Sequence, residues 1–402
     1  MADNEGKVNL GRLTRLAHVG RAPHANHGVV NPPVYHASTI VYPTLAALEE
    51  ADHTPFVGTR YGRRGTPTTF ALEEAVTELE GGYRSIAVSS GLMAITATLL
   101  AFLKTGDHLL MVDTTYGPVR RFCDTILKGL GIETTYYDPL ADIASLLRPE
   151  TRVVYMESPG SLTFEVQDVP RIADAARAHG AISVIDNTWA AGLLFQPLRH
   201  GVDVSIQAAT KYLVGHADAM LGVITTNEPT YLRVRRATAM LGTGVGPDDC
   251  YLGLRGIRTL AVRLARHAET ALAVAAWLAE RPEVAHVLHP ALPSCPGHAV
   301  FTRDFAGSNG LLSIVLHPVS KPALAAMLDE MWLFGLGYSW GGYESLIIPF
   351  DPQASRTATR WPLDGPCLRL HIGLETAEDL MADLEAGFSR LSATNAASTT
   401  GR

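Results

Sequence analysis

Between residues 70 and 207, short apolar segments alternate with longer segments of helical periodicity. The apolar segments are rich in Val, Ile and Leu, which is typical of strands buried on both faces. The predicted strands cover residues 86–88, 109–112, 132–137, 153–156, 182–185 and 202–206, and the predicted helices cover residues 70–80, 91–104 and 170–179. This alternation predicts an α/β fold with a mainly parallel sheet covered by helices.

The length of the chain predicts more than one domain, because 402 residues exceed the size of one ordinary core. Residues 1–60 contain several prolines and no long periodic element, which predicts an extended arm that contacts a neighbouring subunit. We expect a large domain at 61–255 and a smaller α/β domain at 256–392, which begins with one long helix. The small, polar residues 393–402 predict a disordered tail.

Composition argues against several classes of protein. The net charge is −7, and acidic and basic residues are mixed along the chain, so we expect no nucleic-acid partner. No run of about 18 apolar residues occurs and the first residues do not resemble a secretion signal, so we expect no membrane partner. The four cysteines stand singly at spacings unsuited to zinc, which predicts no metal site and a cytoplasmic location.

Two residues carry the main chemical hypothesis. Asp186 ends the apolar strand at 182–185, and Lys211 follows the next predicted strand within a Thr-Lys sequence. Pyridoxal phosphate chemistry needs a lysine that holds the cofactor covalently and a carboxylate that keeps the pyridine nitrogen protonated. We therefore expect the cofactor to be pyridoxal 5'-phosphate. The same two residues could also be a strand cap and a solvent-exposed lysine, so other motifs must decide.

A phosphate site is expected where the first predicted strand meets the following helix. Ser90 can cap that helix, which leaves the backbone N–H groups of Gly91 and Leu92 at the positive end of the helix dipole. The glycine would let a phosphate approach closely. Thr210 can add a hydroxyl group, and Tyr116 can stack on the cofactor ring. Each of these features alone also occurs as ordinary structure in α/β proteins.

Six motifs resemble those of the Cys/Met metabolism family of pyridoxal phosphate enzymes. They are YGRRGT at 61–66, ESPGS at 157–161, DNTWAAG at 186–192, SIQAATKYLVGH at 205–216, YSWGGYES at 338–345 and RLHIGLE at 369–375. The resemblance covers nearly the whole chain and is greatest to the bacterial branch that cleaves cystathionine at its β-carbon. It implies the type I aminotransferase fold, with a seven-stranded sheet in the large domain and a smaller C-terminal α/β domain.

The resemblance also implies a role for each site residue. The catalytic residues would be Lys211 and Tyr116; the cofactor would be bound by Tyr61, Arg63, Gly91, Leu92, Tyr116, Asp186, Thr210 and Lys211, and the substrate by Ser339, Trp340, Arg369 and Ala239. Tyr61 and Arg63 would reach the phosphate of the adjacent subunit, which implies shared active sites in a homo-oligomer, a dimer of dimers. Arg369 would hold the substrate α-carboxylate through two parallel hydrogen bonds.

The implied reaction is an α,β-elimination on a small amino-acid thioether. L-cystathionine would give homocysteine, pyruvate and ammonia, with Lys211 removing the Cα proton and either Lys211 or Tyr116 protonating the departing thiolate. The preference for β- over γ-cleavage depends on the YSWGG sequence at 338–342, where γ-acting relatives usually carry Ser-Leu-Gly-Gly. It also depends on Ser161, where those relatives often carry an asparagine.

Two positions depart from the pattern of the familiar bacterial β-lyases. Ala239 replaces a tyrosine of the substrate pocket, and Arg60 replaces an aromatic residue just before Tyr61. Three alternatives therefore stay open: a β-lyase for another cysteine S-conjugate, a γ-synthase or γ-lyase, and a non-catalytic protein that retains the fold. The presence of Lys211 together with Arg369 favours an enzyme.

Overall fold

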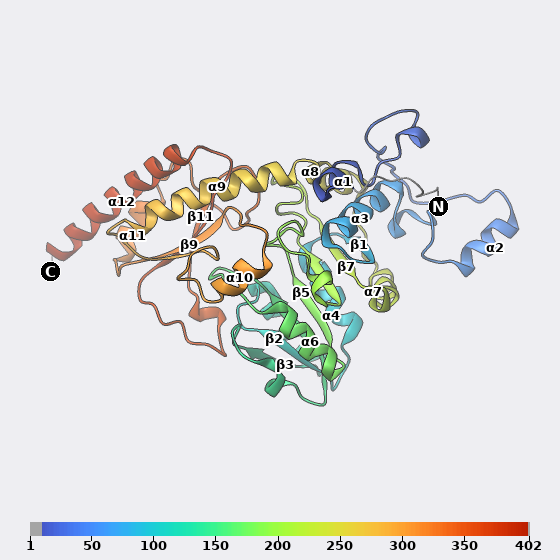
Figure 1. Ribbon diagram of the computed structural model, residues 1–402, viewed down its shortest axis with the longest axis horizontal. Helices are drawn as coiled ribbons and strands as arrows, with labels where there is room; N and C mark the ends of the chain where they lie inside the picture. The colour runs from blue at the N-terminus through green and yellow to red at the C-terminus, as the bar shows by residue number, and fades with distance from the viewer. Residues whose placement is uncertain (1–9, 401–402) are drawn as a thin grey trace.

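A seven-stranded sheet forms the centre of the larger part of the molecule (Figure 1). The computed structural model describes residues 10–400. The strands are β1 (Arg84–Val88), β2 (His108–Val112), β3 (Glu133–Tyr137), β4 (Thr151–Glu157), β5 (Ile182–Asp186), β6 (Val204–Gln207) and β7 (Gly222–Thr226). Their order is β1-β7-β6-β5-β4-β2-β3; β7 runs antiparallel to both of its neighbours, and all the other neighbouring pairs are parallel. The expected mainly parallel, seven-stranded sheet is confirmed.

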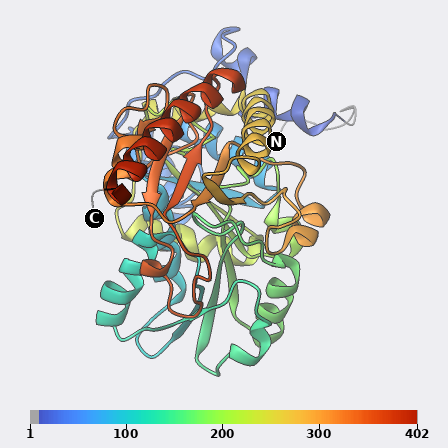
Figure 2. The same ribbon diagram turned by 90° about the vertical axis from the view of Figure 1, so that its left-hand side faces the viewer.

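Helices cover both faces of this sheet (Figure 2). They are α3 (Pro67–Glu80), α4 (Gly91–Phe102), α5 (Gly117–Phe122), α6 (Val169–His179), α7 (Glu228–Met240) and α8 (Pro247–Ile257). Local sequence fixes where α4 begins, because the Ser90 side chain accepts a hydrogen bond of 3.1 Å from the backbone N–H of Met93. Every residue of β2 is buried, as expected for a strand covered on both faces.

Strand β7 was not predicted from the sequence. It begins with Gly222 and ends with two threonines, so only Val223 and Ile224 give it an apolar signal. The glycine is required by packing: a Cβ atom at this position would lie 2.1 Å from the carbonyl oxygen of Ser90. Strand β7 therefore passes directly beneath the start of α4, where the phosphate site is expected.

The smaller part of the chain contains a five-stranded sheet with the strand order β10-β11-β12-β9-β8. Its elements are α9 (Leu260–Ala279), β8 (Val284–Leu288), α10 (His298–Asp304), β9 (Leu311–Leu316), α11 (Lys321–Leu328), β10 (Gly335–Leu336), β11 (Leu346–Phe350), β12 (Cys367–His371) and α12 (Ala377–Thr400). The prediction of one long helix from 256 was wrong in detail, since α8 ends at Ile257 and α9 begins at Leu260. Arg258 at this break donates hydrogen bonds of 2.6 Å to the carbonyl oxygens of Leu16 and Val19.

The two ends of the chain differ from the expectations in secondary structure. Helix α12 continues to Thr400, so the predicted disorder from 393 is wrong as far as this residue, and residues 401–402 lie outside the described range. The side chain of Asn395 accepts a hydrogen bond of 3.2 Å from the backbone N–H of Ser320, which helps to hold this last part of α12. The predicted extended arm contains short helices, α1 (Arg12–His18) and α2 (Leu45–His53), and α2 projects away from the sheets (Figure 1).

A segment of the small domain, residues 351–366, reaches back to the large sheet. Asp113, just beyond β2, accepts hydrogen bonds from the backbone N–H groups of Thr357, Ala358 and Thr359 at 2.8–3.2 Å. Arg120 donates to the same carboxylate. These contacts fix the small sheet, which carries Arg369, relative to the large sheet, which carries Asp186.

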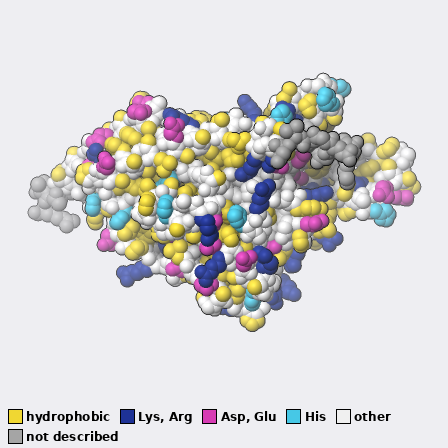
Figure 3. Space-filling model, in the orientation of Figure 1, with side chains coloured by type: hydrophobic (Ala, Val, Ile, Leu, Met, Phe, Trp, Pro, Cys, Tyr) yellow, Lys and Arg dark blue, Asp and Glu magenta, His cyan; other side chains and the backbone are white. Residues whose placement is uncertain are grey.

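On the face shown in Figure 3, acidic and basic side chains are interspersed, and neither sign of charge dominates. Within residues 10–400, no helix has both the length and the apolar composition needed to cross a membrane.

Candidate active site

Lys211 lies in the loop that follows β6, at the junction of the two domains. Its Nζ atom donates a hydrogen bond of 2.7 Å to Ser339 Oγ and lies 5.3 Å from the centre of the Trp340 ring. Burial lowers the pKa of this amine to about 8, and the nearby positive charge of Arg369 acts in the same direction. A much larger fraction of Lys211 is therefore neutral near pH 7 than for an ordinary lysine, as a nucleophile or base requires.

Asp186 is the last residue of β5 and is buried. Its Oδ1 atom accepts hydrogen bonds from both the backbone N–H and the hydroxyl group of Thr188. Burial raises the pKa of the carboxyl group, and the two hydrogen bonds from Thr188 and the charge of Lys211 oppose that rise. Within the described residues, Oδ2 has no hydrogen-bond partner from the protein, which leaves it able to accept a proton donor from a bound ring.

Glu157 was missed as a site residue when the sequence was interpreted. It is the last residue of β4 and lies directly opposite Asp186 in the parallel register. Its Oε2 atom accepts a hydrogen bond of 2.7 Å from the backbone N–H of Tyr116. Burial, followed by the charge of Asp186, raises the pKa of Glu157 well above its ordinary value, so the pair can carry its negative charge on Asp186. The rule that carboxyl ends of parallel strands meet at one edge could have found this residue.

Tyr116 precedes α5, and almost half of its side-chain surface is exposed. Burial of the rest raises the pKa of the phenol, and the charge of Glu157 adds to this effect. The phenol is therefore neutral near pH 7 and can donate a proton or a hydrogen bond. Asp186 is close enough to contribute to the same shift, which places Tyr116 at the edge of the Lys211 site.

The expected phosphate site lies at the start of α4, where the first N–H groups of the helix have no intrahelical partner. The structure gives Gly91 an additional reason to be glycine, because a Cβ atom there would lie 2.4 Å from the Cβ atom of Ala208. The hydroxyl of Thr210 donates to the carbonyl oxygen of Leu221 at 3.2 Å and accepts from the Leu221 N–H at 2.9 Å. Its proton must turn away from that carbonyl before Thr210 can donate to a phosphate.

Arg369 lies on β12 with only 4% of its surface exposed. Its two terminal nitrogens donate to the carbonyl oxygens of Gly337, Tyr338 and Ser339 at 2.8–3.1 Å. Burial lowers the pKa of the guanidinium to about 10, so the group remains charged at neutral pH. Its Nε–H group is buried and has no partner among the described residues, so a donor is left for a substrate carboxylate.

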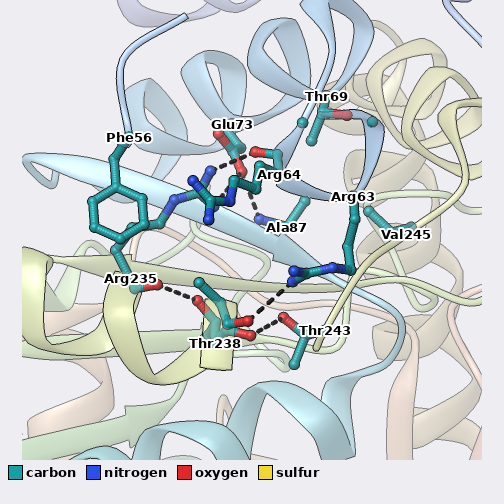
Figure 4. Close-up of a pocket in the computed structure, with 13 residues that line it drawn as sticks. Phe56, Arg63, Arg64, Thr69, Glu73, Ala87, Arg235, Thr238, Thr243 and Val245 are labelled. Carbon is teal, nitrogen blue, oxygen red and sulfur yellow. Dashed lines mark hydrogen bonds and ion pairs between the residues drawn. The ribbon is translucent and has the colours of Figure 1, made fainter. Parts of the chain in front are cut away.

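Three predicted site residues make their hydrogen bonds away from Lys211 and Asp186: Tyr61, Arg63 and Ala239. Arg63 Nη1 donates to the carbonyl oxygen of Ala239 at 3.0 Å, and both residues line a pocket near the end of α7 (Figure 4). Glu73 and Arg235 line the same pocket, whereas Lys211 does not. The described hydrogen-bond partner of the Tyr61 hydroxyl is Ser38. In a single chain, therefore, these three residues form no hydrogen bond with Lys211 or Asp186.

The residues around Lys211 fit pyridoxal phosphate. The group needs a reactive amine, an anionic partner for its ring nitrogen and donors for its phosphate. Lys211, the free oxygen of Asp186 and the start of α4 supply these three features.

Comparisons with known proteins agree with this arrangement. The sequence pattern of the family described as Cys/Met metabolism PLP-dependent enzyme matches residues 13–389. The chain is 48% identical to cystathionine beta-lyase MetC of Escherichia coli strain K12 and 47% identical to cystathionine beta-lyase of Salmonella typhimurium; each alignment covers 94% of this chain and 98% of the relative.

Solved structures of the same family have the same architecture. A cystathionine gamma synthase from Xanthomonas oryzae, solved in complex with cystathionine, aligns with a TM-score of 0.88 at 31% identity. The alignment covers 96% of this chain and 100% of that chain. The fold is therefore the expected type I fold. The chain belongs to the Cys/Met metabolism family of pyridoxal phosphate-dependent enzymes.

Proposed function

We propose that this protein is a carbon–sulfur β-lyase that converts L-cystathionine and water to homocysteine, pyruvate and ammonia. The observation that carries the proposal is the placement of the Lys211 amine, which Ser339 holds at 2.7 Å beside Trp340. The two relatives that share nearly half of their residues with this chain bear the name cystathionine beta-lyase, which supports the same reaction.

Each residue of the site then has a defined task. Bound pyridoxal phosphate supplies the electron sink that makes a proton on the substrate Cα acidic. Arg369 holds the substrate carboxylate, Lys211 Nζ takes the Cα proton, and Asp186 supplies the negative charge for the ring nitrogen. Tyr116, whose phenol is neutral, can give a proton to the departing thiolate, as can Lys211 once it has taken the Cα proton.

The proposal includes a shared site in a homo-oligomer. Tyr61 and Arg63 would bind the cofactor phosphate of the neighbouring subunit, and the part of the arm that follows α1 would lie against that subunit, since α1 itself is held by its own chain. Within the described residues, neither Tyr61 nor Arg63 makes a hydrogen bond to the Lys211 of its own chain, which supports this division. We propose a dimer of such dimers that acts in the cytoplasm.

Cofactor attachment is tested by borohydride reduction of the purified protein followed by peptide mass analysis. The cofactor should be fixed to Lys211, with loss of the yellow colour, and a Lys211→Ala variant should give no such adduct. Attachment to another lysine in the folded protein would contradict the proposal.

The reaction is tested by the products formed from L-cystathionine and from a series of S-alkyl and S-aryl cysteines. Pyruvate should be the keto acid from each substrate that is cleaved. Formation of 2-oxobutyrate from cystathionine would instead identify a γ-lyase. Cleavage of the S-alkyl or S-aryl cysteines without cleavage of cystathionine would identify a β-lyase for another S-conjugate.

A further inference from the structure

His371 has no role in the site as described so far, although it lies two residues after Arg369 on β12. Alternate residues of a strand point to the same face of the sheet, so the two side chains share one face. Both are buried, and both make hydrogen bonds to the loop 337–342. Arg369 binds the carbonyl groups at the start of that loop, and His371 binds its end.

The hydrogen bond to His371 has a defined direction. The backbone N–H of Gly341 points at Nε2 of His371 at 3.1 Å, and a backbone N–H can only donate. Nε2 must therefore accept, which assigns the neutral ring with its proton on Nδ1, a buried atom that has no hydrogen-bond partner among the described residues. The carbonyl oxygen of Gly342 also lies 3.1 Å from Nε2, but a proton on Nε2 would leave the Gly341 N–H facing another donor.

His267 stands beside this ring, with the two ring centres 5.3 Å apart. Its Nδ1 atom lies 2.8 Å from the carbonyl oxygen of Ile372, so that atom carries the proton and donates. Burial lowers the pKa of both imidazoles. For His371, the positive charges of His267 when protonated, of Arg369 and of Lys211 lower the pKa further and oppose a second proton. The neutral form that the Gly341 hydrogen bond needs is therefore the stable form.

Gly341 presses against the main chain of Lys211. Its φ is +89°, and a Cβ atom built on it would lie 2.8 Å from the Lys211 carbonyl carbon and 2.8 Å from the Tyr212 nitrogen. The loop thus touches Lys211 twice, once at its backbone through Gly341 and once at its amine through Ser339. Ser339 lies two residues before Gly341, so a shift of Gly341 would be expected to disturb both contacts.

We propose that His371 is a positioning residue. Its Nε2 atom holds Gly341 against Lys211 and so fixes the positions of Ser339 and of the carbonyl groups that Arg369 binds. Arg369 donates to one end of the loop, and His371 accepts from the other end. When a substrate carboxylate draws on the donors of Arg369, the His371 contact remains to keep the loop in place. This inference rests on the proposed function only for its activity measurement.

The experiment compares His371→Leu with His289→Leu. His289 is a matched control, because it is also fully buried and its Nδ1 atom also accepts a backbone N–H, from Ala291 at 3.1 Å. In His371→Leu, amide hydrogen exchange of the peptide 337–342 should accelerate and kcat/KM for cystathionine should fall about tenfold to a hundredfold. In His289→Leu, neither quantity should change by more than about twofold, because His289 makes no hydrogen bond to the loop 337–342 among the described residues.

A second pair of variants decides the case where His371→Leu does not fold. His371→Gln can place an oxygen near the position of Nε2, whereas the shorter side chain of His371→Asn cannot. The glutamine variant should keep slow exchange in the loop and most of the activity, and the asparagine variant should lose both. Equal behaviour of these two variants, or unchanged exchange in a folded His371→Leu protein, would overturn the proposal.

The exchange measurement separates this inference from the proposed function. A wild-type protein that does not cleave cystathionine would end the functional proposal, yet the loop exchange would still report on His371. Conversely, a normal lyase whose loop exchange and kcat/KM are indifferent to His371 would end the positioning role alone.

Discussion

Replacing Gly341 by alanine tests how closely the loop is pressed on Lys211. The new Cβ atom would lie 2.8 Å from two backbone atoms, the Lys211 carbonyl carbon and the Tyr212 nitrogen, which cannot rotate away as a side chain could. The residue also has a φ of +89°, which alanine adopts only with strain. The substitution therefore adds a collision to a backbone cost.

Gly106 separates these two effects. Its φ is +88°, and a Cβ atom built there meets nothing within 4 Å. Gly106→Ala should cost about 1–2 kcal/mol of stability from backbone strain alone. Gly341→Ala should bear the same strain and a further cost of about 1–3 kcal/mol from overpacking. If the chain unfolds as one unit, each kcal/mol lowers Tm by about 1 °C for a protein of this length.

The decisive measurement is the rate of pyruvate formation alongside Tm. If the loop shifts to relieve the collision, the 2.7 Å hydrogen bond between Lys211 and Ser339 is lost or lengthened. We expect kcat/KM of Gly341→Ala to fall about tenfold to a hundredfold, the effect of losing about 1.4 to 2.7 kcal/mol of transition-state stabilisation. Gly106→Ala should keep its wild-type rate. Equal Tm and equal rates in the two variants would refute the close contact between the loop and Lys211.

Three further predictions concern the cofactor, the assembly and the substrate. Cofactor-free protein should attach pyridoxal phosphate at a rate that rises with pH up to about 8 and then levels, since the pKa of Lys211 is lowered to about 8 and the neutral amine is the reactive form; a rise continuing toward pH 10 would indicate an ordinary lysine. Inactive Lys211→Ala and Arg63→Ala chains refolded together should regain part of the activity, and proven mixed dimers without recovery would place Arg63 in its own chain's site. Ala239→Tyr should raise the preference for cystathionine over S-aryl cysteines about tenfold, by adding one hydrogen-bonding partner, and an unchanged ratio would place Ala239 outside the pocket.

The sequence predicted most strands of the large sheet and missed features that depend on tertiary contacts. Strand β7 is an example, because Gly222 serves close packing beneath α4 and gives no apolar signal. The break between α8 and α9 is another, since Arg258 there is bound by carbonyl groups of the distant residues Leu16 and Val19. Local patterns contain no information about such partners.

The residues of the site differ in the kind of sequence information from which they could be predicted. Asp186 and Lys211 could be proposed from chemistry, because a strand end and a Thr-Lys sequence can be recognised in the amino-acid sequence itself. Ser339 and Arg369 came from the resemblance alone, since more than a hundred residues separate them from Lys211. His371 could have been proposed from strand alternation with Arg369, but its partner Gly341 lies on a loop that no periodicity describes.

The pocket at Arg63 suggests how substrate preference could change while the chemistry stays the same. Arg63 is held by the carbonyl oxygen of residue 239, and this backbone group is present whatever side chain the residue carries. Replacement of tyrosine by alanine at this position therefore leaves the Arg63 contact intact and alters only the space and hydrogen bonds offered by the side chain. The proton-transfer group, Lys211 with Ser339, is supported by a separate loop. Residue 239 can accordingly vary without disturbing either the arginine proposed for the phosphate or the lysine proposed for catalysis.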